Sequence, residues 1–166
     1  PYCKESETRP ADQTDNSRSV GTLFTFGKAR ILDLGDLTWD KEMQLMCPVN
    51  KLGKVDILVV SHHGLFQSSS PALVEAVAPR IAIMNNGAKK GGSPPTFVTL
   101  AKSPGLETLW QLHYSDEAAD KNGPAEYIAN TTGSDAANYL KLTVKPNGGF
   151  SMFNPRTGAT KDYAAR

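Results

Sequence analysis

Apolar runs separated by turn residues divide most of the chain into short strands and helices. The continuous run Ile57–Val60 is bounded by Gly53 and Gly64, a pattern typical of a strand that is covered on both faces. Upstream, Val20–Phe26 and Ala29–Leu34 flank a Gly-Lys turn and therefore predict a β-hairpin. Later strands are expected at residues 80–86, 107–114, 139–145 and 150–153, the last two forming a closing hairpin.

Three helices are expected between these strands. Trp39, Met43 and Met46 recur at helical spacing and predict a short amphipathic helix with an apolar face. Helices that alternate with strands between residues 36 and 114 indicate parallel βαβ crossovers, so we expect an α/β fold with helices packed on a mixed sheet. The other two helices are expected over residues 71–78, after a serine cap, and over residues 96–103.

The remaining segments set the boundaries of a single domain. Residues 1–19 are polar and rich in turn-forming side chains, so they predict an arm or loop before the fold, which is expected to span residues 20–155. Residues 115–137 lack periodicity and predict a surface excursion, and the glycine-rich segment 87–95 predicts a flexible loop. Residues 156–166 are expected to form a C-terminal tail.

Composition and charge give no support to two classes of partner, nucleic acids and membranes. The chain has 18 basic and 17 acidic residues, a net charge of +1, and no basic cluster longer than Lys89-Lys90, so charge gives no support to nucleic-acid binding. No apolar segment approaches the roughly 20 residues that cross a bilayer, so no membrane partner is expected. The chain opens at Pro1 without an initiator methionine, which indicates a processed product.

The two cysteines leave two alternatives open. Cys3 and Cys47 match no zinc-binding or Cys-x-x-Cys spacing, so either a long-range disulfide or two unpaired thiols is expected. A disulfide is typical of a periplasmic or secreted protein, whereas unpaired thiols are typical of a cytoplasmic one. The cysteines therefore link the redox state of the chain to its localisation.

Polar residues that can bind a metal follow two of the expected strands. Asp36 follows the hairpin, and the pair His62 and His63 follows Ile57–Val60. Because loops at the carboxyl ends of parallel strands project side chains into one crevice, Asp36 and His62 are expected to approach each other. A carboxylate and a neutral imidazole suit zinc, manganese or iron. The structural alternatives are a helix cap for Asp36 and backbone hydrogen bonds for the two histidines.

The order of these motifs resembles that of a known family. "LDLGDL", then "VDILVVSHHG" and "PRIAIMNNG", resemble the C-terminal half of a metallo-β-lactamase-fold hydrolase, in the branch that includes the hydrolase domain of bacterial competence DNA-uptake proteins. The resemblance covers about Ser17 to Tyr114. It implies a four-layer αββα sandwich with one or two metal ions at an edge of its sheets, and hydrolysis of esters, phosphodiesters, lactams or thioesters.

The resemblance also assigns roles to individual residues. Asp36 matches the family's metal-bridging aspartate, and His62 matches its last histidine ligand, with zinc as the expected ion and manganese or iron as alternatives. His63 is then expected either to support a metal ligand from behind or to face the substrate, where it can donate a proton. His113, at the end of the strand expected over residues 107–114, is the second candidate proton donor, because imidazole titrates near neutral pH.

One departure from the family pattern limits these expectations. The family's main ligand cluster, His-x-His-x-Asp-His, is missing from a chain that has three histidines, so metal is expected to bind weakly or not at all to this chain alone. The expected partners are the missing N-terminal half of the fold or a second copy, together with a small-molecule or phosphodiester substrate. The alternative function is a degenerate, non-catalytic hydrolase fold that serves binding.

Overall fold

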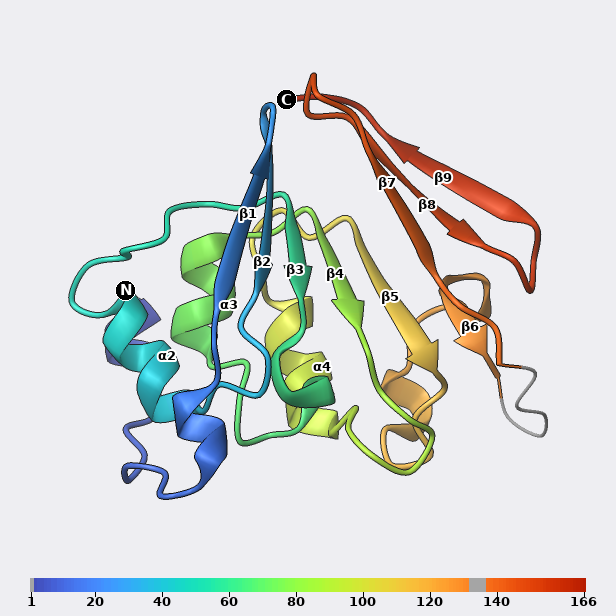
Figure 1. Ribbon diagram of the computed structural model, residues 1–166. Coiled ribbons are helices and arrows are strands. Elements are labelled where there is room, and N and C mark those ends of the chain that lie inside the picture. Colours follow the sequence, from blue (N-terminus) through green and yellow to red (C-terminus); the bar gives the residue numbers. More distant parts are fainter. Residues whose placement is uncertain (1, 132–136) are drawn as a thin grey trace.

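The computed structural model describes residues 2–131 and 137–166 (Figure 1). The helices are α1 (Tyr2–Glu5), α2 (Trp39–Met46), α3 (Pro71–Val77) and α4 (Pro94–Ala101), and the short helical turns are η1 (Asp15–Arg18), η2 (Ser61–Gly64), η3 (Ala119–Lys121) and η4 (Ala125–Tyr127). The strands are β1 (Thr22–Phe26), β2 (Ala29–Asp33), β3 (Ile57–Val59), β4 (Ile81–Met84), β5 (Thr108–His113), β6 (Ile128–Asn130), β7 (Lys141–Val144), β8 (Phe150–Asn154) and β9 (Ala159–Tyr163).

Two separate sheets organise these strands. The larger sheet has the order β1-β2-β3-β4-β5-β6, in which β1 and β2 pair antiparallel and every later pair is parallel. The mixed sheet and its N-terminal hairpin are therefore confirmed. The smaller sheet, β7-β8-β9, is antiparallel throughout and lies beside the larger one (Figure 1).

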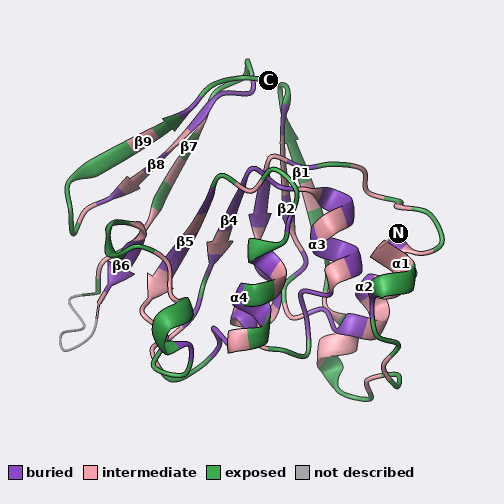
Figure 2. Cartoon of the chain, turned by 180° about the vertical axis from the view of Figure 1, so that it is seen from behind, coloured by how far each residue is buried: buried purple, intermediate pink, exposed green. Residues whose placement is uncertain are grey.

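Successive side chains along the central strands point to opposite faces of the larger sheet and contribute to two different apolar cores. Leu58 belongs to the core that the larger sheet shares with α3 and α4, which lie on one face of that sheet (Figure 2). Its neighbour Ile57 points the other way and packs with Phe150 and Met152 of the smaller sheet. The described residues thus supply a helix layer and two sheets, whereas the expected αββα sandwich has a helix layer on each side.

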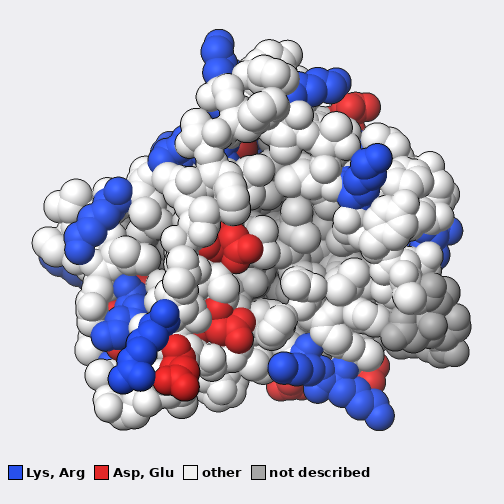
Figure 3. All heavy atoms as spheres, in the orientation of Figure 1, with Lys and Arg blue, Asp and Glu red and all other residues white. Residues whose placement is uncertain are grey.

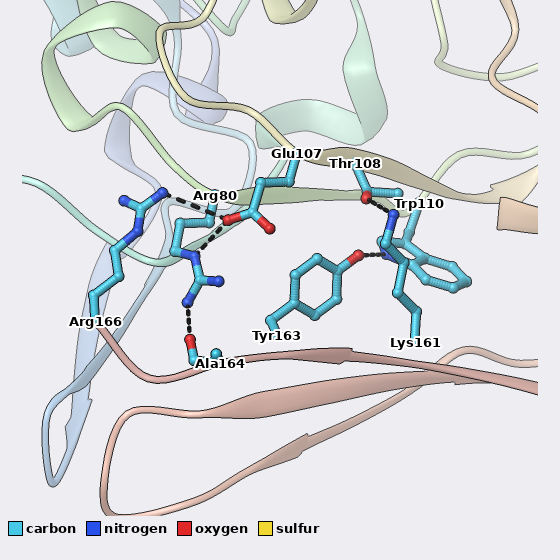
Figure 4. A network of polar contacts seen from close by, with 8 residues as sticks. All are labelled: Arg80, Glu107, Thr108, Trp110, Lys161, Tyr163, Ala164 and Arg166. Atoms are coloured by element: carbon cyan, nitrogen blue, oxygen red, sulfur yellow. Dashed lines mark hydrogen bonds and ion pairs between the residues drawn. The ribbon is translucent and has the colours of Figure 1, made fainter.

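A polar network reinforces the contact between the two sheets (Figure 4). Arg80, the residue directly before β4, donates to Glu107 Oε1 at 2.7 Å and to the Ala164 carbonyl at 2.7 Å. The indole of Trp110 donates to the Tyr163 hydroxyl at 3.0 Å, and burial raises the pKa of that tyrosine. The buried groups of this network, on Arg80, Trp110 and Tyr163, therefore each have a partner, which limits the cost of burying them.

A disulfide joins Cys3 of α1 to Cys47, which directly follows α2. Of the two alternatives for the cysteines, the long-range disulfide is the correct one. The arm expected over residues 1–19 is therefore fastened at its start and carries α1 and η1. Its contacts with the domain come from residues too far apart in sequence for local patterns to show.

Three expectations about the C-terminal half were incomplete. The surface excursion expected over residues 115–137 contains β6, a buried strand that pairs parallel with β5; residues 132–136 of that prediction lie outside the described residues. The tail expected over 156–166 contains β9, whose mostly polar side chains hide its strand pattern. Helix α4 begins two residues early because its prolines occupy the first turn, where no amide hydrogen is needed.

The helices are short. The longest, α2 and α4, have eight residues each, and no helix in the described ranges has the length and apolar character needed to cross a membrane.

Candidate functional site

Asp36 and His62 follow the carboxyl ends of the neighbouring strands β2 and β3, at the same edge of the larger sheet. Asp33 of β2 is in register with Val59 of β3, and each of the two candidate ligands lies three residues further along its chain. The His62 backbone amide donates to the Gly35 carbonyl at 2.9 Å, which ties the two loops together. The two loops therefore lie side by side, as expected, and the ion pair that Asp36 forms is with His63. The roles of Asp36 and His62 as metal ligands stay a prediction.

The two histidines occupy an unusual backbone conformation. His62 has φ 53° and ψ 42°, and His63 has φ 56° and ψ 18°, so both lie in the left-handed region that non-glycine residues avoid. Each such residue costs roughly 1–3 kcal/mol and persists only where its surroundings enforce it. Here the Leu65 amide donates to the His62 carbonyl and the Gly92 amide to the His63 carbonyl, both at 2.9 Å. Strain of this kind concentrates at functional sites.

The ring of His63 is oriented by a backbone carbonyl. Its Nδ1 lies 2.9 Å from the Asn85 carbonyl oxygen, which can only accept, so Nδ1 carries a hydrogen. In the neutral ring this leaves the lone pair on Nε2, which lies 3.7 Å from Asp36 Oδ1. His63 therefore presents its free nitrogen to the carboxylate.

The ring of His62 is oriented in the same sense by a serine. Ser68 Oγ donates to the Leu37 carbonyl at 2.7 Å, so it accepts from His62 Nδ1 at 3.3 Å. The lone pair of His62 is then on Nε2, 3.3 Å from the side-chain nitrogen of Asn16. Burial lowers the pKa of His62 and so favours the neutral ring. The negative charge of Asp36 acts in the opposite direction but is the smaller effect.

Both imidazoles thus match one requirement of a metal ligand. A ligating histidine usually donates its other ring N–H to a carbonyl or another acceptor, which fixes the tautomer and aims the free nitrogen. His62 and His63 meet this condition, and the Asp36 carboxylate lies beside the second ring. However, no group of three or more His, Cys, Asp and Glu side chains within residues 2–131 and 137–166 is arranged to hold a metal ion. The donor set therefore fits a cation only in part.

His113 is placed differently from the other candidates. It ends β5, and β4 lies between β5 and β3, so its backbone is about 10 Å from that of the His62 turn by the usual strand spacing. Asn86 binds its backbone through both amide atoms. Among the described residues, no hydrogen bond or ion pair joins the His113 ring to the other three candidates. Its role as a proton donor stays a prediction.

The segment 87–95, expected to be a flexible loop, packs against the histidine turn. Gly91 and Gly92 are buried, and Gly91 has φ +80°, where a Cβ would collide with the His63 carbonyl oxygen. The glycines therefore allow this loop to pack directly under the histidine turn. Lys89 and Lys90 remain exposed beside it.

A buried carboxylate near the site was missed by sequence reasoning. Glu42 of α2 is fully buried, and its two oxygens accept from the amides of Ser69 and Ser70 at 2.9 and 2.7 Å. It thereby fixes the segment that leads from Ser68, the partner of His62, into α3. The signal was present in the sequence: Glu42 lies on the same helical face as Trp39, where a charged side chain is out of place.

We expect Glu42 to make the chain less stable as pH rises. Burial raises its pKa from 4.5 to about 7, so between these values the folded state binds more protons than the unfolded state. Its contribution is fully present below pH 4.5, is lost as pH rises through 7, and amounts to on the order of 3 kcal/mol. Urea unfolding at pH 5 and pH 8 measures the difference. Glu42→Gln should flatten it, while Glu75→Gln, at a partly exposed position of α3, should not.

A cavity of about 380 Å³ lies between the N-terminal arm, the start of α2 and the loop that follows the histidine turn. Its walls include Trp39 and Phe66, and the guanidinium of Arg9 lies 3.6 Å from the centroid of the Trp39 ring. Arg9 also donates to the Phe66 carbonyl, which binds the N-terminal arm to the loop after His63. The cavity is therefore formed jointly by the arm and the loops that carry the candidate ligands.

Comparison with known proteins gives one distant similarity. Over 75 residues, 45% of the chain, the sequence is 37% identical to the protein named Recombination protein 2 of Haemophilus influenzae. The aligned part spans 9% of that protein's length. No family model and no solved structure matches the chain.

Proposed function

We propose that this chain is the C-terminal half of a metallo-β-lactamase-type domain that catalyses metal-dependent hydrolysis of an ester or phosphodiester. The observation that carries the proposal is the meeting of Asp36, His62 and His63 at the carboxyl edge of the sheet, with both rings held by their Nδ1 atoms. The succession of helices, mixed sheet and second sheet is also compatible with part of an αββα sandwich.

Each side chain has a distinct part in this proposal. Asp36 and His62 would hold the ion, zinc or alternatively manganese or iron, through a carboxylate oxygen and Nε2. An ion bound there supplies a nucleophile at neutral pH and polarises the scissile group. His63 keeps its Nε2 beside Asp36, and once this nitrogen has taken up a proton, the imidazolium can give that proton to the leaving group. Ser68 and Asn85 hold the two rings in the required orientations.

The distribution of surface charge and the similarity to Recombination protein 2 both bear on the substrate class. On the face shown in Figure 3, lysine and arginine side chains are scattered and carboxylates lie among them, which is unlike a continuous nucleic-acid-binding surface. The name Recombination protein 2 favours a phosphodiester over the lactams and thioesters that the resemblance also allows. We therefore propose a small or terminal phosphodiester as the first substrate to test.

The Cys3–Cys47 disulfide supports a location for this activity. Disulfides persist in oxidising compartments and are rare in the cytoplasm, so we propose that the protein functions in the periplasm or outside the cell.

Hydrolysis of bis-p-nitrophenyl phosphate with added Zn²⁺ or Mn²⁺ tests the proposal. We expect metal-dependent release of p-nitrophenol when the chain is combined with the N-terminal half that the family pattern requires, and a loss of about 100-fold or more when Asp36→Ala is introduced. Asp162→Ala, which removes an exposed carboxylate of β9, serves as the control. Activity that survives Asp36→Ala, or that needs no metal, would refute the proposed site.

The second candidate function is a non-catalytic binding domain of the same fold. It is favoured by the incomplete donor set among the described residues, which supplies one carboxylate and two imidazoles rather than a full cluster. Absence of metal binding and of hydrolysis, in a chain that unfolds cooperatively, would support it.

A further inference from the structure

The N-terminal arm places a polar side chain against the nitrogen that the proposed site would use. The side-chain amide of Asn16 lies 3.3 Å from His62 Nε2, although 46 residues separate the two along the chain. His62 Nδ1 is engaged by Ser68, so Nε2 is the ring's ligand position. Any cation bound by His62 must therefore contact Asn16 or displace it.

Asn16 is held in this position by its own turn. It belongs to η1, in which Ser17 Oγ donates to the Thr14 carbonyl at 2.8 Å and the Ser19 amide donates to the Asn16 carbonyl at 3.0 Å. Asp12 accepts from the Thr14 amide at 2.7 Å and fixes the start of that turn. The backbone around Asn16 is therefore fixed by hydrogen bonds within its own turn.

The rest of the arm is fastened on both sides of this turn. Arg9 stacks on Trp39 and donates to the Phe66 carbonyl at 2.6 Å, and the disulfide anchors Cys3 further upstream. On the other side the chain enters β1. A side chain carried by a segment fixed at both ends is preorganised, so it loses little conformational entropy when it binds a ligand.

The side-chain amide of Asn16 can do more than hydrogen-bond to His62 Nε2, because its oxygen can also bind a cation. Without a cation, the amide NH₂ of Asn16 donates to the lone pair of His62 Nε2. A half turn about the last side-chain bond brings Oδ1 to the same place, and amide oxygens are ordinary ligands of hard and borderline cations. One side chain can therefore satisfy the imidazole in the apo state and share a cation with it in the bound state.

We propose that Asn16 is the third protein ligand of the cation site formed with Asp36 and His62. This inference rests on the proposed function, because it requires that a cation binds there. It also addresses the incomplete donor set, since an amide oxygen adds a ligand that a cluster of His, Cys, Asp and Glu does not include. The arm then belongs to the site as much as the strand-end loops do.

Titration of the chain with Co²⁺, followed by its visible absorption, tests the ligand role without an activity assay. We expect Asn16→Ala to weaken Co²⁺ binding about ten-fold and to change the absorption spectrum, because a ligand is lost. Asn16→Asp should strengthen binding about ten-fold, because it places a carboxylate at the same point. Gln13→Ala, which removes an exposed amide on the same arm that donates to the Ala11 carbonyl, is the control.

The outcomes separate this inference from the function on which it rests. Unchanged or tighter Co²⁺ binding in Asn16→Ala would mean that the amide only covers His62, and would overturn the ligand role while leaving the site intact. No Co²⁺ binding by the wild-type chain or by Asn16→Asp would overturn both. Circular dichroism and the unfolding midpoint of each variant establish that a loss of binding is not a loss of fold.

Discussion

Replacement of both Cys3 and Cys47 by serine is expected to lower the free energy of unfolding by about 4 kcal/mol. The disulfide closes a loop with a sequence separation of 44, and chain entropy predicts a stabilisation of this size for such a loop. Urea unfolding of the double variant and of the wild type, both at pH 7, measures it. The same loss should follow when the wild-type chain is fully reduced.

The contacts of the arm provide the control for this prediction. Arg9→Ala removes the stacking on Trp39 without opening the covalent loop, so it should cost about 1 kcal/mol. A double serine variant that is destabilised no more than Arg9→Ala would show that the disulfide adds little to an arm already held by side chains. It would also weaken the case for an oxidising compartment.

Replacement of His62 by alanine is expected to reduce the affinity for Co²⁺ roughly 100-fold, because the ring supplies a ligand whose orientation Ser68 has already fixed. Isothermal titration calorimetry with wild type and variant gives the two dissociation constants. His113→Ala is the matched control, since it removes an imidazole from the same edge of the sheet but from β5. Its affinity should equal that of the wild type.

Equal losses in the two histidine variants would contradict the site as described. Such a result would indicate that Co²⁺ binds loosely to any imidazole of the chain, or that the His113 ring joins the site when a cation is present. A loss in His113→Ala alone would move the site to the end of β5.

The part of the site that the sequence predicts depends on strand topology. Parallel strands end at the same edge of a sheet, so the positions of Asp36 after β2 and His62 after β3 followed from the expected βαβ order. The same reasoning placed His113 at that edge but could not show that β4 separates it from the histidine pair. Hydrophobic periodicity predicts where strands occur along the chain more readily than which strands lie next to each other in the sheet.

Other parts of the site depend on contacts that no local pattern contains. Asn16 reaches His62 because an arm fixed by a disulfide passes over the strand ends, and the polar composition of residues 1–19 indicated only a loop. Gly91 appeared to be a flexible loop residue because its packing partner, the His63 carbonyl, lies elsewhere in the chain. Glu42 was the exception: its place on the buried face of α2 was readable from helical spacing.

Long-range ¹H–¹⁵N correlation spectra of the histidine rings during a Zn²⁺ titration test most directly whether these residues form a cation site. We predict that His62 and His63 carry their ring hydrogens on Nδ1 before metal is added, and that the Nε2 signal of His62 moves and saturates at a stoichiometric amount of Zn²⁺. Asp36→Ala should abolish this change. Histidine signals that stay unchanged with Zn²⁺, or a His62 ring with its hydrogen on Nε2, would contradict the account.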